Sequence, residues 1–126
     1  MIDHLSVGVA NLTRSRGFYD KVLKTLGYKR ELTFPHAVGY GREGKPSFWL
    51  GPATGRAKAK AMPGFHVAFV AADRKSVDRF YKAAIAAGAK DNGKPGPRPL
   101  YHANYYGAFV VDPDGHHIEA VCHQPE

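Results

Sequence analysis

The sequence predicts an α+β fold in which one pattern of a strand, a helix and further strands occurs twice. Apolar residues alternate over residues 2–9 and again over 65–70, as they do in half-buried strands. A segment with apolar residues at helical spacing follows each stretch. His4 and His66, which lie in these two stretches, are 62 positions apart, and so are the aromatic pairs of the two helical segments. An internal repeat explains this match better than chance similarity.

The first half contains one helix and three further strand candidates. Asn11 or Thr13 can cap a helix that runs to about Leu26 and stops at Gly27. The strand candidates lie near residues 28–34, 37–41 and 46–51, separated by turn-forming residues. Residues 52–64 combine glycine, proline and a basic cluster, which predicts an exposed linker.

The second half repeats this order. Asp73 can cap a helix that Gly88 ends. Residues 90–98 are rich in turn formers, and the last strands are predicted over 100–112 and 117–123. We therefore expect a single domain over residues 1–126, with a first module of about 1–52, a linker of about 53–63 and a second module of about 64–126.

Composition narrows the class of protein. A chain of 126 residues with 44% hydrophobic content can build one ordinary core. No apolar run reaches the roughly 18 residues that span a bilayer, and the single cysteine, Cys122, rules out an internal disulfide framework, so we expect a cytoplasmic protein without membrane contact. The net charge of +7 comes from scattered basic residues without a nucleic-acid-binding motif, which favours a small anionic ligand over nucleic acid.

Glu119 is the residue that points to chemistry. Its neighbours Ile118 and Ala120 predict a mostly buried strand, where an ionised carboxylate is costly unless a positive group meets it. His4 and His66, on two other predicted strands, are the candidates. Two imidazoles and one carboxylate form the ligand set of a divalent metal site with open positions.

Strand parity supports the grouping. If His4 faces a cleft, the small residues Ser6 and Gly8 share its face, and the larger apolar residues between them face the helices. Glu119 shares its face with His117, which makes His117 a further cleft candidate. Each proposed ligand therefore has room beside it for an ion and a substrate.

Three motifs together resemble the vicinal oxygen chelate superfamily. They are Ile2-Asp3-His4-Leu5, residues 64–69, and Asp112-Pro113-Asp114-Gly115 continuing to Ile118-Glu119. The superfamily holds glyoxalase I, extradiol dioxygenases, fosfomycin-resistance enzymes and bleomycin-resistance binding proteins. The resemblance implies two βαβββ modules whose curled sheets enclose a cleft, with a metal ion bound inside by residues from the first and last strands of each module.

One position departs from the glyoxalase pattern. Trp49 stands where glyoxalase-like members carry a fourth ligand, and its indole can only donate a hydrogen bond. The remaining His4, His66 and Glu119 are similar to the two-histidine, one-carboxylate sites of Fe(II) oxygenases, and the ion can be Fe2+, Zn2+, Ni2+ or Mn2+. Alternatively, Trp49 stacks on an aromatic ligand.

The stretch from Leu100 to Tyr106 supplies candidates for proton transfer. In extradiol dioxygenases a histidine and a tyrosine near the metal handle protons, and the resemblance implies that role for His102 with Tyr105 or Tyr106. We take His102 and Tyr106 as catalytic candidates and Tyr105 as a cleft residue. The competing interpretation of these side chains is ordinary aromatic packing.

The sequence thus predicts a metal-dependent protein that chelates a small anionic or phenolic substrate. Isomerase, lyase and ring-opening dioxygenase chemistry remain open, and a homodimer is plausible for this architecture. The alternative is a non-catalytic, drug-sequestering protein that stacks its ligand on Trp49 and tyrosines; the basic charge disfavours a cationic drug for such a site.

Overall fold

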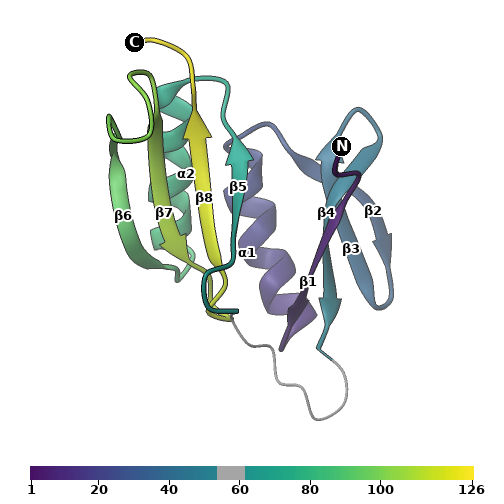
Figure 1. The fold of residues 1–126 in the computed structure, drawn as a ribbon. Helices are drawn as coiled ribbons and strands as arrows, with labels where there is room; N and C mark the ends of the chain where they lie inside the picture. The colour runs from purple at the N-terminus through teal and green to yellow at the C-terminus, as the bar shows by residue number, and fades with distance from the viewer. Residues whose placement is uncertain (54–61) are drawn as a thin grey trace.

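The computed structural model describes residues 1–53 and 62–126, and it confirms the predicted repeat (Figure 1). The centre of the predicted linker, residues 54–61, lies outside this description. The first unit consists of β1 (Leu5–Val9), α1 (Leu12–Lys24), β2 (Lys29–Phe34), β3 (Ala37–Arg42) and β4 (Lys45–Pro52). The second consists of β5 (His66–Val70), α2 (Arg74–Ala86), β6 (Lys90–Pro97), β7 (Tyr106–Val111) and β8 (His117–Cys122).

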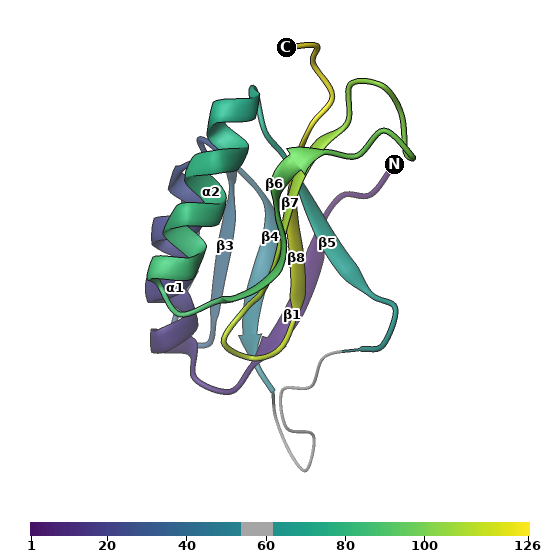
Figure 2. The same cartoon turned by 90° about the vertical axis from the view of Figure 1, so that its left-hand side faces the viewer.

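The two units form separate four-stranded sheets of the same topology. Their strand orders are β1-β4-β3-β2 and β5-β8-β7-β6, with one parallel pair in each sheet, β1 with β4 and β5 with β8. Ser6 is paired with Trp49 in the first sheet, and Ala68 is paired with Glu119 in the second. Trp49 and Glu119 therefore occupy equivalent positions. Both helices lie on the same side of the sheets, which leaves the opposite faces open (Figure 2).

Both helices start at the N-cap residues that the sequence predicts, and their apolar faces are buried. Asn11 accepts a hydrogen bond from the Arg14 amide at 3.0 Å, and Asp73 accepts one from the Ser76 amide at 2.7 Å, so both helices have a side-chain N-cap. Their buried faces join the sheets in one core that includes Tyr19 and residues of both units. Within the described parts of the chain, no helix is long and apolar enough to cross a membrane.

The sequence prediction was wrong for one strand. Residues 90–98 were expected to be turns, but Lys90–Pro97 forms β6, at the outer edge of its sheet. An edge strand bonds to a neighbour on one side only, so it tolerates prolines, and its register with β7 shifts at Gly93. The strand predicted over residues 100–112 also starts later than expected, because the chain forms a loop before β7 begins at Tyr106, whereas β8 starts at His117 as predicted.

The Asp112–Gly115 turn does more than reverse the chain, because it joins the two units. Asp114 Oδ1 accepts hydrogen bonds from the Ala10 amide at 3.0 Å and the Arg14 guanidinium at 2.8 Å, and its Oδ2 accepts one from the Ser15 hydroxyl at 2.9 Å. All three donors lie at or next to the start of α1 in the other unit. A carboxylate at a helix N-terminus is favourable, so this turn fixes the second unit against the first.

Tyr19 forms the buried part of the same junction. Its hydroxyl group also makes the free energy of unfolding depend on pH. Its hydroxyl donates to Asp112 Oδ2 at 2.5 Å, and both side chains are almost fully buried. Burial, and then the charge of Asp112, raises the pKa of Tyr19 well above its ordinary value. Because the folded state holds this proton more tightly than the unfolded state does, its contribution to stability is complete below pH of about 10 and is lost as pH rises further.

We therefore expect the free energy of unfolding to fall steeply above pH of about 10. Urea unfolding followed by circular dichroism between pH 8 and 11 measures this dependence. The Tyr19→Phe variant should be less stable at pH 8 but should lose less stability over the same range. Equal slopes for the two proteins would contradict the role given to Tyr19. Burial also raises the pKa of Tyr40 and of Tyr105, and these tyrosines contribute to the dependence that remains in the variant.

Candidate functional site

The open face of the second sheet carries a polar group around Glu119. β8 presents Ile118 and Ala120 to the helices, so Glu119 between them points to the other face. Its side chain is nevertheless only 1% exposed. His66 lies at the start of the neighbouring strand β5, two residues before the position paired with Glu119. His66, an expected partner of the buried carboxylate, therefore lies next to it.

Both carboxylate oxygens of Glu119 have partners. His66 Nε2 lies 3.2 Å from Oε2, and the Tyr105 hydroxyl donates a hydrogen bond to Oε1. Burial, and then the hydrogen bond and charge of Glu119, raise the pKa of Tyr105. The tyrosine thus remains protonated and a donor. His66 is half exposed, with 52% of its side chain accessible, so the pair can be approached from the open side.

Gly107 on β7 leaves the space that this group occupies. A Cβ atom at Gly107 would lie 3.1 Å from Glu119 Oε1 and 3.2 Å from the Tyr105 ring. Contacts this short would push the tyrosine away from the carboxylate. A glycine within a strand often marks such a close approach, and this was the signal in the sequence for this part of the site.

The loop from Arg98 to Tyr105 holds Tyr105 in place. The Arg98 amide donates to the Tyr105 carbonyl at 2.8 Å, and the Tyr105 amide donates to the His102 carbonyl at 3.1 Å. The ring of Tyr105 packs edge-on against Tyr101 and His102, with centroids 4.9 and 5.4 Å away. The guanidinium of Arg98 donates to backbone carbonyls at the end of β6. Arg98 therefore supports the loop.

His4, the third predicted ligand, lies in the other unit. It immediately precedes β1, and its Nδ1 lies 2.7 Å from Asp3 Oδ1. Asp3 is also paired with Lys45 at 3.0 Å, and these two partners, His4 first, lower the pKa of Asp3. β1 starts near the top of Figure 1 and β5 near the bottom, so the starts of the two strands, with His4 and His66, lie toward opposite ends.

The structure therefore brings two of the three predicted ligands together. Across residues 1–53 and 62–126, no three His, Cys, Asp or Glu side chains lie close enough to hold an ion. The spacing of His66 and Glu119 nevertheless suits a shared metal ion. Two donor atoms that each lie about 2.1 Å from one ion are about 3.0–3.4 Å from each other, and His66 Nε2 is 3.2 Å from Glu119 Oε2. His4 also has a suitable environment, since a metal-binding histidine usually donates its other ring nitrogen to a carboxylate, as His4 can to Asp3.

The open face of the first sheet is aromatic. Trp49 and Phe34 stack there with centroids 6.2 Å apart and planes 16° apart, and both line an open cavity of about 510 Å³ together with His4. Gly39 lies beneath the indole: a Cβ there would be 2.9 Å from Trp49. Trp49 thus faces the open side, as parity predicts, within the first unit.

Of the other predicted site residues, Tyr106 and His117 lie on opposite faces of the second sheet. Tyr106 points to the helices, where its hydroxyl donates to Asp78 at 2.8 Å and its ring lies under Arg74. The structure therefore does not bring Tyr106 to Glu119; Tyr105 is there instead. His117 is exposed and is paired with His66 across the β5–β8 ladder, so it borders the group.

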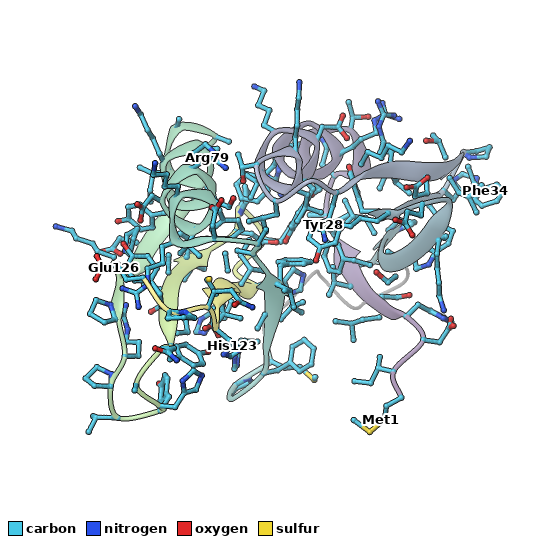
Figure 3. The ribbon with its side chains drawn as sticks, turned by 90° about the horizontal axis from the view of Figure 1, so that it is seen from above. Met1, Tyr28, Phe34, Arg79, His123 and Glu126 are labelled. Carbon is cyan, nitrogen blue, oxygen red and sulfur yellow. The ribbon has the colours of Figure 1, made fainter. Side chains whose placement is uncertain are left out.

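His123 is a neighbour of the site that the sequence analysis did not select. It follows β8 on the same face as Glu119, and its Nδ1 lies 2.8 Å from His102 Nε2. Figure 3 shows His123 on the side of the sheets away from the helices, opposite Arg79. Its alternation with Glu119 along β8 was the available signal, but a histidine near a chain end usually has no role of this kind.

Comparison with protein families identifies the chain. Residues 1–120 match the family model described as Glyoxalase/Bleomycin resistance protein/Dioxygenase superfamily. The chain belongs to this superfamily. No curated protein is significantly similar to it.

Solved structures of the superfamily share its fold. A glyoxalase/bleomycin resistance protein from Albidiferax ferrireducens is 30% identical, with a TM-score of 0.87 over 95% of this chain and 97% of that one. A glyoxalase-related enzyme from Fulvimarina pelagi is 18% identical, with a TM-score of 0.75 over 97% and 87%. A glyoxalase/bleomycin resistance protein/dioxygenase family enzyme from Burkholderia phytofirmans is 19% identical, with a TM-score of 0.73 over 98% of both chains. The repeated βαβββ unit is thus the superfamily fold.

Proposed function

We propose that this member of the superfamily binds a divalent metal ion through His66 and Glu119, and that His4 of a second copy completes the site. The observation that carries the proposal is the buried carboxylate of Glu119, with one oxygen bonded to Tyr105 and the other 3.2 Å from an exposed imidazole. A buried negative charge of this kind is stabilised by a cation. The imidazole nitrogen and carboxylate oxygen are both suitable donors for Fe2+, Zn2+, Ni2+ or Mn2+.

Several features support a second copy as the source of His4. The bonds of Asp114 and Asp112 to the first unit fix the two units of one chain against each other. β1 and β5 are edge strands, and exposed apolar residues flank the crevice of about 370 Å³ between them, with Ile2 80% and Val70 58% exposed. Burying such residues favours association, and a twofold pair would exchange His4 residues reciprocally.

The residues of the chain have distinct parts in this proposal. Glu119 supplies the negative charge, and Tyr105 fixes its orientation by donating to Oε1. The ion, when bound, acts as a Lewis acid on two adjacent oxygens of a small substrate. The net charge of +7 favours an anionic or phenolic substrate. Isomerase, lyase and dioxygenase chemistry all begin from such a chelate.

Elemental analysis of protein purified without chelator tests the proposal. We expect about one ion per chain in the wild type, and less than about a tenth of that in Glu119→Gln and in His66→Ala, because each change removes a donor that the chain cannot replace. His36→Ala is the matched control, since His36 lies in the turn between β2 and β3. A wild type that stays metal-free after reconstitution with Fe2+, Zn2+, Ni2+ and Mn2+ would falsify the metal site.

A second candidate function is the binding of an aromatic molecule without chemistry. It is favoured by the open cavity of about 510 Å³, where Trp49 and Phe34 are stacked above Gly39. Aromatic faces bind planar ligands by stacking, and this cavity needs no ion to do so. The two functions differ in whether ligand binding depends on Glu119.

Trp49 reports on this cavity directly, because it is the only tryptophan of the chain. We expect a planar aromatic probe such as naphthalene-2-carboxylate to quench its fluorescence saturably, and Phe34→Leu to weaken that binding several-fold through lost stacking. Glu119→Gln is the deciding variant. Equal affinity in Glu119→Gln and metal-free wild type supports simple binding, whereas binding that requires both the metal and Glu119 supports the metal-dependent function. Absence of quenching would remove Trp49 from the ligand site.

A further inference from the structure

A cavity of about 490 Å³ lies where the start of α2 meets the end of β8. The start of α2, the start of β7 and the end of β8 lie together at the top of Figure 1. Arg74 and Lys75 line the cavity from the first turn of α2, and Tyr106 and Cys122 line it from the two strands. Both strand residues face the helices, whereas Glu119 points to the open side of the sheet. The cavity is therefore separate from the proposed metal site.

Arg74 lines this cavity with an incomplete set of partners. Its Nε atom is buried and has no hydrogen-bond partner among residues 1–53 and 62–126. Its guanidinium lies over the ring of Tyr106, 5.1 Å from the centroid, and its Nη1 is 3.7 Å from Glu126 Oε2. The second distance is longer than a hydrogen bond. A buried N–H group without an acceptor is costly, so an acceptor for Arg74 is missing here.

The acidic side chains around Arg74 do not supply this acceptor. Asp73 caps α2 by accepting two hydrogen bonds from its first turn, both at 2.7 Å. Asp78 accepts a tyrosine hydroxyl at 2.8 Å. In the part of the chain that the structure describes, the ion pair of Arg74 is with Glu126, whose side chain is 92% exposed. Water and salt weaken such a pair, so an anion from solution can displace it.

We propose that this cavity binds the carboxylate of a small molecule through the guanidinium of Arg74. The two oxygens of a carboxylate match the parallel N–H groups along one edge of a guanidinium, and that edge can include Nε. Arg74 keeps 23% of its side chain exposed, so a ligand in the cavity can reach it. The bound carboxylate takes the place of the Glu126 side chain and supplies the missing acceptor.

The lining of the cavity defines the class of ligand. Two cationic and two acidic side chains line it besides Glu126, so the charge around Arg74 is balanced before Glu126 is counted. A ligand with one negative charge can replace Glu126, whereas the second charge of a phosphate is repelled by the two aspartates. Tyr106 and Pro125 add apolar surface to the lining. The ligand class is therefore a monocarboxylate with a compact apolar body.

Amide chemical shifts of metal-free, ¹⁵N-labelled protein test the proposal with cyclohexanecarboxylate as the probe. Without a metal ion the probe has no chelate site at Glu119, and its aliphatic ring does not stack on Trp49. We expect saturable shifts at residues 74–78 and 122–126. Cyclohexanecarboxamide, which has the same shape without the charge, should bind at least about tenfold more weakly. Shifts that are absent from these residues, or equal binding of the amide, would overturn the proposal.

Variants of two arginines on α2 separate a specific contact from general attraction by charge. We expect Arg74→Gln to weaken binding of the probe about tenfold, because its charge-assisted hydrogen bonds are lost. Arg79→Gln removes the same charge from an exposed position outside the lining, and it should change binding less than about twofold. Glu126→Gln should strengthen binding about twofold, since it removes the competing carboxylate. Equal weakening by the two arginine variants would overturn the role of Arg74.

Two further measurements test the match between carboxylate and guanidinium. Arg74→Lys keeps the charge but not the planar pair of donors, so it should recover only part of the affinity, and full recovery would overturn the paired contact. Inorganic phosphate should bind at least about tenfold more weakly than cyclohexanecarboxylate. Tighter binding of phosphate would overturn the ligand class. Circular dichroism shows whether each variant is folded, and Arg74→Lys provides the test if Arg74→Gln is not.

Discussion

We expect Asp112→Ala to lower the free energy of unfolding by about 4 kcal/mol, because it leaves three donors without their acceptor. Asp112 is 4% exposed and accepts the Tyr19 hydroxyl at 2.5 Å. It also accepts the amides of Asp114 at 2.9 Å and His116 at 2.8 Å, which shape the turn before β8. The loss therefore affects the turn and the junction of the two units together.

Urea unfolding of the variant measures this effect, with Tyr19→Phe as the matched control. Tyr19→Phe leaves Asp112 its two backbone donors and should cost only about 1–2 kcal/mol. The double variant should be less destabilised than the sum of the two single changes, because Asp112→Ala has already removed the partner of Tyr19. A loss below about 1 kcal/mol in Asp112→Ala would mean that solvent replaces the carboxylate at little cost.

The turn at Asp112–Gly115 was predicted from the sequence, but its second role, joining the two units, was not. Asp112-Pro113-Asp114-Gly115 predicts a tight turn from its own residues. Besides nearby amides, its two carboxylates bind Tyr19 and the start of α1, about 100 positions away in the chain. Local propensity carries no information about such contacts.

The fold itself was largely predictable, since alternation, helical periodicity and helix caps are local signals that recur after 62 residues. β6 was missed because its prolines and glycines are turn formers, and they are tolerated only by its place at the sheet edge. The sequence also could not show which of Tyr105 and Tyr106 lies beside Glu119. Which of two adjacent residues faces the open side depends on where β7 begins, and the structure places its start at Tyr106.

The site was predictable in part because parity decides which face a residue is on. Parity places Glu119 and His66 on the open face, and pairing of β5 with β8 then brings them together. His4 lines the open cavity of the first sheet with Trp49, but its distance from Glu119 depends on how the two units are placed. That placement comes from packing of the helices and from the Asp112 and Asp114 contacts, which sequence periodicity does not describe.

A mixed dimer of two variants decides whether the ligands come from one chain or two. His4→Ala and Glu119→Gln chains with different affinity tags are co-expressed, and the mixed species is isolated on both tags. If sites are shared, the Glu119→Gln chain supplies His4 to the intact His66 and Glu119 of the His4→Ala chain. We then expect about one ion per mixed dimer, about two in the wild type and almost none in either variant alone.

The same mixed dimer gives the opposite result if each chain builds its own site. No chain in it then has both His4 and Glu119, so the mixed dimer should hold no ion. A His4→Ala homodimer that keeps its full metal content would instead remove His4 from the ligand set and leave His66 and Glu119 with other partners. The exposed position of His4, which is bonded to Asp3 just before the edge strand β1 of the other unit, favours recovery of one ion. Recovery would also establish the dimer as the metal-binding form, because no monomer in the mixture carries all three ligands.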